Sequence, residues 1–206
     1  VSGFYPDAYN STHQGGDINL VKSNLYKIRK LMDQHNSHTL IDINYHLYKN
    51  NNDKNLKKFK ELAEELGFIL STTYALVMPF ERVINKLEGK PDQQTSQLEE
   101  NLLVGIEEGI EISSLNIEEK SSCPFRENQV NINADLSVPV CCIVFNKSQN
   151  IVSNNFLDSS LSEISNNKKD ISTCKKCMNL RLPEYNMGYN KHLWNERAQS
   201  KKSLDI

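Results

Sequence analysis

The placement of cysteine constrains this chain more than any other feature of its sequence. All five cysteines lie after residue 122, and four of them come from three separate places: Cys123, Cys141, and the pair Cys174 and Cys177. The last two form a CxxC motif. Four thiolates can close one tetrahedral site, and soft sulfur ligands select zinc or an iron–sulfur cluster. The sequence therefore predicts a metal centre within residues 123–183.

The alternative is that these cysteines are buried structural thiols, since free cysteine often packs as a small hydrophobic side chain. Their spacing favours ligation, but a CxxC motif fits zinc and iron–sulfur sites equally. Adjacent strand residues point to opposite faces, so we expect Cys142, next to Cys141, to pack in the core beneath the site. Lys175 and Lys176, inside the motif, either offset the charge of a thiolate cluster or are two exposed lysines.

Charge and composition argue against several classes of partner. The 206 residues carry a formal net charge of −2 with no block of like charge, so nothing indicates a nucleic-acid or membrane partner. The longest apolar run, residues 138–145, is too short to span a bilayer. An odd cysteine count without a signal-peptide pattern predicts a reducing, cytoplasmic location. The start at Val1, without an initiator methionine, suggests a fragment of a longer protein.

Residues 1–76 alternate helical and strand patterns. Apolar residues recur at helical spacing over 18–32, after a plausible N-cap at Asp17, and again over 56–66, before a glycine. Strand patterns cover 39–48 and begin again at residue 68. Because strands and helices alternate, we expect parallel β/α units, and hence an α/β fold.

The strand predicted at 39–48 has a polar face, formed by its even positions Asp42, Asn44, His46 and Tyr48. Parallel sheets are usually buried on both faces, so a polar face indicates a lumen that holds a ligand. The alternative is a strand with one solvated face. We expect Asp42, Asn44 and His46 to point inward and the apolar set, Ile41, Ile43 and Tyr45, to face the helices.

The rest of the chain is expected to form a helical linker, a small α+β cysteine domain and a polar tail, at residues 77–122, 123–183 and 184–206. The linker pattern predicts helices over 81–87 and 96–112. In the cysteine domain we expect short strands at 130–133 and 138–144, and a helix at 157–164. The tail is expected to be loosely held, apart from Trp194.

The cysteine region also matches a known pattern. It contains Cys-Pro at Cys123, a strand, a turn at Asp135-Leu136, a strand that ends Pro-Val-Cys-Cys at Cys141, a short helix and the CxxC motif. This order resembles the auxiliary-cluster domain of radical S-adenosylmethionine (radical SAM) enzymes, called SPASM or, when shortened, twitch. The resemblance implies an auxiliary 4Fe-4S cluster, rather than zinc, on Cys123, Cys141, Cys174 and Cys177.

Two positions depart from that family pattern. The family has a glycine five residues before its second ligand, where this chain has Leu136. Full SPASM domains continue with further cysteines after the CxxC motif, but the matching position here is Pro183. The resemblance therefore implies at most one auxiliary cluster and puts the turn at Leu136 in question.

Residues 1–76 resemble the later half of the partial (β/α) barrel of the same enzymes. Val1-Ser2-Gly3 is similar to the end of a Ser-x-Asp-Gly strand, and the loop after it matches at Tyr9, His13, Gly15 and Gly16. By this resemblance Ser2 contacts the ribose of S-adenosylmethionine, although a terminal serine can equally be frayed. Asn44 and His46 would be further cofactor-binding residues that line the path to the substrate.

The resemblance implies the C-terminal portion of a radical SAM enzyme. Such enzymes cleave S-adenosylmethionine reductively to a 5′-deoxyadenosyl radical, using an electron donor protein and a second 4Fe-4S cluster on a CxxxCxxC motif. This chain lacks that motif, so we expect it upstream in the intact protein and expect no activity from this chain alone. The substrate class, whether peptide, saccharide or small metabolite, stays open.

A second function belongs to a different class. A four-cysteine zinc site would have no redox chemistry and would staple residues 123–183 as part of a non-catalytic binding module.

Overall fold

The computed structural model of the chain describes residues 1–51, 53–117 and 122–202. The chain splits into two compact units. Unit 1 consists of Val1–Ala75 with Asn101–Leu103, and unit 2 of Leu76–Glu100 with Val104–Ile206. The first boundary lies next to the one expected after residue 76. The expected linker, cysteine domain and tail instead share unit 2, apart from residues 101–103.

Unit 1 alternates helices and strands: α1 (Pro6–Asn10), α2 (Ile18–Gln34), β1 (Asp42–Leu47), α3 (Asp53–Leu66) and β2 (Ile69–Tyr74). β1 and β2 pair in parallel, with Asp42 opposite Ile69 and Leu47 opposite Tyr74. Asp17 caps α2 as expected, because its carboxylate accepts a hydrogen bond from the Asn19 amide at 2.8 Å. The predicted parallel arrangement of the strands is therefore confirmed.

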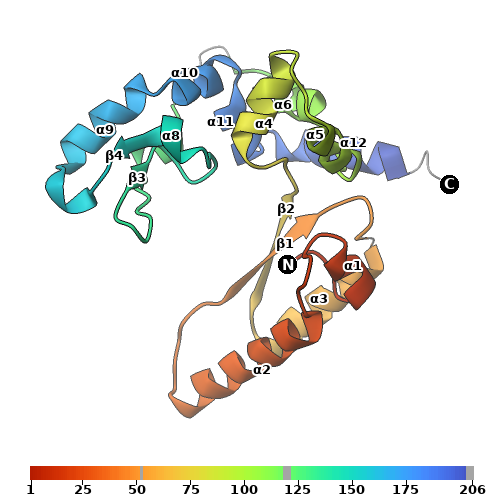
Figure 1. Cartoon of the computed structure of the whole chain (residues 1–206). Helices are drawn as coiled ribbons and strands as arrows, with labels where there is room; N and C mark the ends of the chain where they lie inside the picture. The colour runs from red at the N-terminus through yellow and green to blue at the C-terminus, as the bar shows by residue number, and fades with distance from the viewer. Residues whose placement is uncertain (52, 118–121, 203–206) are drawn as a thin grey trace. The chain divides into compact units, whose positions relative to one another are not determined.

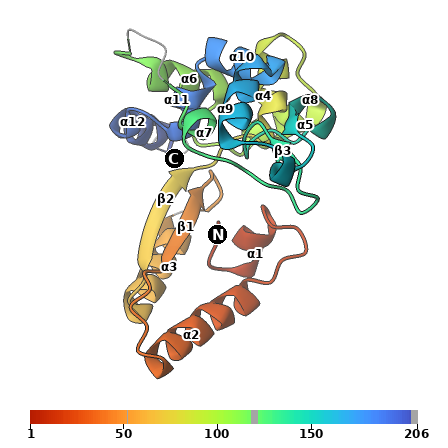
Figure 2. The ribbon, with the colours of Figure 1, turned by 90° about the vertical axis from the view of Figure 1, so that its left-hand side faces the viewer.

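One face of the β1–β2 sheet forms the core of unit 1. Ile43 and Tyr45 of β1 are buried against Ile18 of α2 and Phe59 of α3, so both helices pack on this face (Figures 1 and 2). The even positions of β1 are exposed, so the apolar side chains face the helices as expected, while the expected lumen stays a prediction. Ser71 donates a hydrogen bond to Asp42 at 2.9 Å and Asn44 to Thr73 at 3.1 Å, so polar side chains link the strands across the open face.

The chain start lies at the other edge of β1. The Val1 nitrogen donates to the Asn44 carbonyl oxygen at 2.8 Å, and the His46 amide donates to the Val1 carbonyl oxygen at 2.8 Å. This is the hydrogen-bond pattern of a parallel bridge. Val1 therefore runs parallel to β1, and β2 runs parallel to β1 at the opposite edge. The mixed α/β class is confirmed, while the expected later half of a barrel stays a prediction.

Unit 2 is mainly helical. Its elements are α4 (Phe80–Leu87), α5 (Gln93–Glu100), α6 (Ile106–Ser114), α7 (Pro124–Glu127), β3 (Val138–Pro139), α8 (Lys147–Asn150), β4 (Ile151–Ser153), the 3-10 helix η1 (Phe156–Asp158), α9 (Leu161–Asp170), α10 (Ser172–Asn179), α11 (Leu182–Met187) and α12 (Lys191–Lys202). β3 and β4 pair antiparallel. In the described part of either unit, no helix has the length and apolar character needed to cross a bilayer.

The helix expected over 96–112 is two helices, α5 and α6. Gly105 is extended and forms the N-cap of α6, and the Glu108 side chain accepts a hydrogen bond from the Gly105 amide at 3.2 Å. Buried Leu102 and Leu103 lie in the connection, which belongs to unit 1. The helical periodicity of this stretch concealed the break, because both sides of it carry buried apolar residues.

Three other elements of unit 2 differ from their predictions. Residues 130–133, all described, form no strand, and the strand expected at 138–144 is confined to β3. The helix expected at 157–164 is α9, which begins at Leu161. Its start is fixed by a capping box, in which Ser160 and Glu163 satisfy each other's backbone amides at 3.2 and 2.8 Å.

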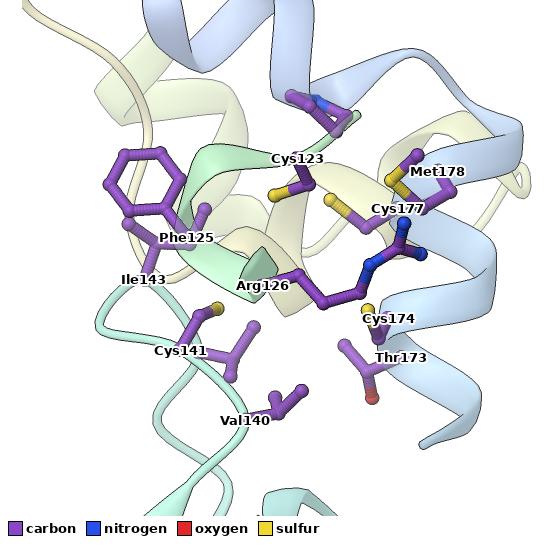
Figure 3. Close-up of a pocket in the computed structure, with 12 residues that line it drawn as sticks. Cys123, Phe125, Arg126, Val140, Cys141, Ile143, Thr173, Cys174, Cys177 and Met178 are labelled. Atoms are coloured by element: carbon purple, nitrogen blue, oxygen red, sulfur yellow. The ribbon is translucent and has the colours of Figure 1, made fainter. Parts of the chain in front are cut away.

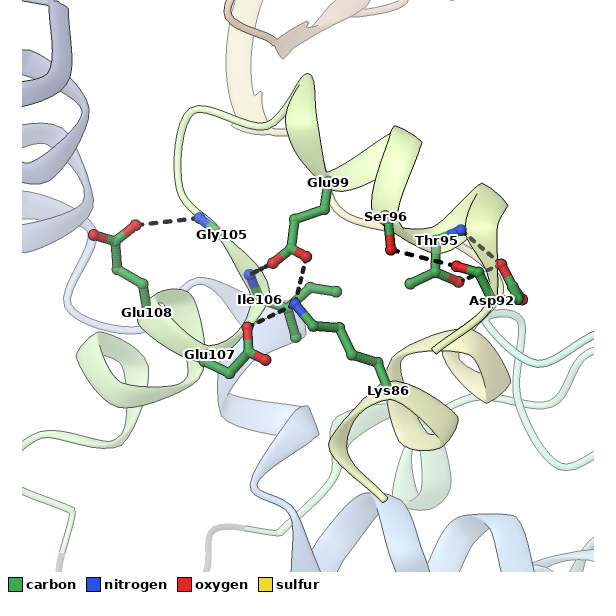
Figure 4. A network of polar contacts seen from close by, with 9 residues as sticks. All are labelled: Lys86, Asp92, Thr95, Ser96, Glu99, Gly105, Ile106, Glu107 and Glu108. Carbon is green, nitrogen blue, oxygen red and sulfur yellow. Dashed lines mark hydrogen bonds and ion pairs between the residues drawn. The ribbon is translucent and has the colours of Figure 1, made fainter. Parts of the chain in front are cut away.

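A polar network joins α4, α5 and α6 (Figure 4). The Lys86 ammonium contacts the carboxylates of Glu99 and Glu107, the latter at 2.9 Å, and Glu99 also accepts from the Ile106 amide at 2.9 Å. Burial lowers the pKa of Lys86, but hydrogen bonds to the two carboxylates outweigh it and raise the pKa overall. The network therefore fixes the start of α6 to the end of α5.

The expected loose tail is instead a packed helix over its described residues. In α12, Trp194 is buried, and its indole nitrogen donates to the Ser113 hydroxyl at 3.0 Å. Arg197 and Lys201 pair with Glu108 of α6 at 2.9 and 2.5 Å. The segment is therefore fixed to α6 by one buried aromatic side chain and two ion pairs, despite its polar composition.

Gly109 of α6 permits this packing. A Cβ atom there would lie 2.6 Å from Cε2 of Tyr185 and 2.7 Å from Cη2 of Trp194. We expect Gly109→Ala to lower the free energy of unfolding of unit 2 by about 1–3 kcal/mol, because both rings are buried and must shift. Urea denaturation monitored by Trp194 fluorescence measures this. Glu111→Ala, on the exposed side of α6, is the control, and equal stability of the two variants would contradict the packing argument.

Leu136, where the family pattern has a glycine, adopts a backbone conformation that favours glycine. Its φ is +65°, in the left-handed region, and its amide donates to the Asn133 carbonyl oxygen at 2.9 Å. A non-glycine residue in the left-handed region lowers the free energy of unfolding by about 1–2 kcal/mol. Glycine at this position should therefore raise the free energy of unfolding, whereas alanine should not. We expect Leu136→Gly to be more stable than Leu136→Ala by about 1 kcal/mol in denaturant melts. At Leu161, which is exposed in α9, the glycine variant should instead be less stable than the alanine variant. If glycine were the more stable variant at both positions, the argument from backbone conformation would be refuted.

Candidate metal centre

Four of the five cysteines line a single cavity in unit 2. They are Cys123, Cys141, Cys174 and Cys177, the four residues predicted as ligands. Figure 3 shows their side chains on different walls of the same space, contributed by the start of α7, the loop after β3, and α10. The fold therefore brings together cysteines that are 18 to 54 residues apart between the three segments. Their role as ligands stays a prediction.

Local hydrogen bonds hold each cysteine in place. Cys123 is the N-cap residue of α7, and its carbonyl oxygen accepts from the amides of Arg126 and Glu127, both at 3.0 Å. Before Cys141, the Val140 amide donates to the Asn150 carbonyl oxygen at 2.8 Å. The CxxC motif lies within α10, where a spacing of three residues places both side chains on one face.

The rest of the cavity wall is largely apolar. It is formed by Phe125, Val140, Ile143, Val144, Met178 and Pro183, with Thr173 and Arg126 as the other residues. Burial raises the pKa of Cys141 to about 11 and also raises the pKa of Cys174 and Cys177, with further contributions from neighbouring thiols. Burial therefore favours the neutral form of Cys141, Cys174 and Cys177 at neutral pH, and a metal that binds these thiols must displace their protons.

Two cations flank the thiols, and neither was singled out from the sequence. The Arg126 side chain extends across the cavity towards α10 (Figure 3), and its guanidinium lowers the pKa of Cys174 against the larger effect of burial. Lys168 of α9 is buried beside α7. The motif lysines that we considered instead pair with carboxylates, Lys175 with Asp170 at 3.5 Å and Lys176 with Glu88 at 2.6 Å.

Cys142 does not line this cavity. Its side chain is exposed, and its sulfur lies 3.8 Å from the side-chain oxygen of Gln129. It lines a neighbouring hollow with Pro139 and Phe145, and Cys141 lies in the wall of both spaces. Cys142 is therefore turned away from the other four thiols, but the expectation that it packs in the core was wrong, because the chain bends after β3 and carries it to the surface.

The cavity is not a ready-made site for a single ion. In the described parts of the chain, no group of three or more His, Cys, Asp or Glu side chains is arranged to hold one. The free space between the walls is about 20 Å³, enough for one water-sized sphere. The donor set and the walls suit a soft metal centre, but any ligand would have to draw the thiols together or move the walls apart.

A larger polar cleft adjoins the cysteine cavity. It has a volume of about 660 Å³, and its walls come from α4, the segment at Asn146–Gln149 and α10. Thr173 lies in the wall of both spaces. Glu81 fixes the cleft wall, because one of its carboxylate oxygens accepts from the amides of Phe145 and Asn146, both at 2.8 Å. The cleft and the cysteine cavity therefore lie on two sides of Thr173, the residue before Cys174.

The three residues assigned to cofactor binding lie in unit 1. Ser2 is fully buried, and its hydroxyl contacts Thr12 and lies 2.9 Å from Nδ1 of His13. It is therefore not frayed. Asn44 and His46 lie on the open polar face of β1, where Asn44 bonds Thr73. The structure tests none of their proposed contacts with a cofactor.

His13, which matches the family pattern in the loop after Val1-Ser2-Gly3, contacts Ser2. Its ring stacks on Tyr9 with a centroid distance of 4.3 Å. Burial lowers the pKa of both His13 and His46, and the charge of His13 lowers that of His46 further. Buried Asn51 fastens the same region, donating to the carbonyl oxygens of Ser2 and His46 at 3.0 and 2.5 Å. Ser2 and His13 are thus in contact, and Asn51 ties the Ser2 backbone to the end of β1 at His46.

Comparison with family models, with curated proteins and with solved structures found no match to this chain.

We expect the five single Cys→Ser variants to separate into two groups. Variants at the four cavity positions, Cys123, Cys141, Cys174 and Cys177, should lose bound metal, because each removes one of four thiolate ligands. Cys142→Ser should keep the metal and change the free energy of unfolding by less than about 0.5 kcal/mol, since the side chain is exposed. Metal analysis of the purified variants measures this. Loss of metal from Cys142→Ser, with Cys141→Ser unaffected, would show that the wrong one of the adjacent pair was assigned.

Proposed function

We propose that Cys123, Cys141, Cys174 and Cys177 bind one auxiliary 4Fe-4S cluster, and that the chain is the C-terminal portion of a radical SAM enzyme. The observation that carries the proposal is the placement of these four cysteines, and not Cys142, around one apolar cavity. Four thiolates are the usual ligand set of a 4Fe-4S cluster. Of the five cysteines, this selects the same four as the SPASM-type spacing.

An unpartnered donor at the cavity also fits such a cluster. Nε of Arg126 is buried and has no hydrogen-bond partner within the described ranges. Buried donors without partners are rare, and iron–sulfur clusters accept hydrogen bonds at their sulfurs. Arg126 would therefore orient towards a bound cluster and offset part of its negative charge. When bound, the cluster would pass single electrons or anchor a substrate.

Unit 1 would be the later half of a partial (β/α) barrel. The parallel β1–β2 pair, the bridge at Val1 and the polar open face support this assignment. Ser2, Asn44 and His46 would contact S-adenosylmethionine or line the path to the substrate. His13 would support them, because it bonds Ser2 and lies close enough to His46 to lower its pKa.

The intact enzyme would need more than this sequence contains. S-adenosylmethionine cleavage requires a second 4Fe-4S cluster on a CxxxCxxC motif, which the 206 residues lack. An electron donor protein would supply reducing equivalents. The substrate would be a peptide, a saccharide or a small metabolite, and the polar cleft next to Thr173 would admit a small polar group to the auxiliary cluster. A reducing cytoplasm would preserve the thiols.

A structural zinc site is the second candidate. The free space of about 20 Å³ between the walls matches a single ion better than a cluster of eight atoms. Zinc on four thiolates would staple α7, the loop after β3 and α10 without redox chemistry. Unit 2 would then belong to a binding module.

Anaerobic reconstitution distinguishes the two candidates. We expect the chain treated with ferrous iron and sulfide to turn brown and to retain about four iron atoms and four sulfides per chain. Cys142→Ser is the matched control that should behave in the same way, and Cys174→Ser should stay colourless. A folded, colourless protein that takes up about one zinc ion and no cluster would overturn the iron–sulfur assignment in favour of zinc. Failure to bind either metal would reject both candidates.

A further inference from the structure

The buried lysine beside the cysteine cavity has an unusual set of partners. Among the described residues, Lys168 is the one lysine whose side chain is buried, with 1% of its surface exposed. Its ammonium donates to the carbonyl oxygens of Phe125 at 3.3 Å, Arg126 at 3.4 Å and, in a shorter contact, Gln129. All three carbonyls belong to α7 or the turn after it, directly following Cys123.

These contacts fix the segment that presents Cys123. A helix as short as α7 leaves its last carbonyls without partners in the helix, and a cation at that end satisfies them. The amides of Arg126 and Glu127 in turn bond the Cys123 carbonyl oxygen. Lys168, on α9, therefore holds the backbone that carries one cavity cysteine from a helix that contributes none of them.

Hydrogen bonds to carbonyl oxygens do not by themselves offset the cost of burying the charge of Lys168. A buried ammonium costs several kcal/mol unless an opposite charge lies near it. In the described parts of the chain, no carboxylate pairs with it. Burial lowers the pKa of Lys168, and negative charge on Cys141, Cys174 and Cys123 would oppose this effect. A metal that binds four cysteines converts their thiols to thiolates, which brings negative charge to this place.

We propose that Lys168 is a positioning residue of the metal centre, which holds the α7 segment through its carbonyl oxygens and whose charge is coupled to the bound four-thiolate centre. The inference rests on the proposed metal site, but it applies to a zinc-type tetrathiolate as well as to a 4Fe-4S cluster, because both are anionic. Coupling is reciprocal, so metal binding should stabilise the charged lysine and the charged lysine should strengthen metal binding.

The decisive variant is Lys168→Gln, which can still donate to the carbonyl oxygens but lacks the charge. Lys169→Gln makes the same change of charge one residue along α9 at an exposed position and is the matched control. The probe is Co²⁺, titrated into the metal-free chain and followed by thiolate-to-cobalt absorbance. We expect Lys168→Gln to weaken Co²⁺ binding roughly tenfold or more, as for partners of metal ligands generally, with Lys169→Gln unchanged and Lys168→Arg close to wild type.

A second measurement separates charge coupling from simple structural support. Thermal unfolding of each variant should show a loss of stability in Lys168→Gln that is larger in the metal-loaded than in the metal-free form. If a 4Fe-4S cluster forms, its reduction potential in Lys168→Gln should be more negative than in wild type, because removing a positive charge disfavours the more negative reduced cluster.

The outcomes are distinguishable. A wild-type chain that binds neither Co²⁺ nor iron and sulfide would reject the metal site itself, and the inference with it. A wild-type chain that binds Co²⁺, together with equal affinities in Lys168→Gln and Lys169→Gln, would overturn the role of Lys168 alone. A Lys168→Gln protein that fails to fold without metal, or that loses equal stability in both forms, would also overturn it, because the charge would then serve the metal-free fold.

Discussion

The burial of four thiols in one apolar cavity is the constraint on which unit 2 depends. The elements that supply them are short: α7 has four residues, β3 two and α10 eight. None of these elements could bury enough apolar surface to be stable alone. Contacts around the cavity that they share must therefore hold them in place. The surrounding helices α4, α6, α11 and α12 form a packed scaffold with an aromatic centre of Phe80, Tyr185 and Trp194. A metal bound by the cysteines would add the cross-link that the short elements lack.

The charged side chains around the cavity favour an anionic metal centre, as the placement of the four cysteines does. Four thiolates and a metal make an anionic centre, and an apolar wall alone would oppose it. Arg126 and Lys168 place positive charge beside the thiols, although Arg126 also pairs with Glu127 at 2.9 Å, and Lys175 and Lys176 pair with Asp170 and Glu88. The cations that matter to the site therefore come from α7 and α9, and the lysines of the CxxC motif serve the protein surface.

Much of unit 1 could be read from periodicity. The alternation in β1 predicted which side chains are buried, the Asp17 cap and the glycine after α3 predicted helix ends, and strand–helix alternation predicted parallel pairing. Prediction was poorer in unit 2. A continuous helical pattern concealed the break at Gly105, and the polar composition of α12 concealed a packed helix around Trp194. In these cases the structure depends on contacts between residues distant in sequence, and local sequence patterns do not indicate such contacts.

The sequence by itself determined the candidate ligands: a CxxC pair and two further cysteines can close one site, and strand alternation with the family resemblance favoured Cys141 over the adjacent Cys142. Tertiary structure decided what surrounds them. It placed Lys168 against the carbonyl oxygens after Cys123, turned Cys142 outward, kept the turn at Leu136 without glycine, and joined His13 to Ser2. The physical reason is that ligand identity is a property of side-chain chemistry and spacing. Burial, charge compensation and backbone strain depend instead on which distant segments the fold brings into contact.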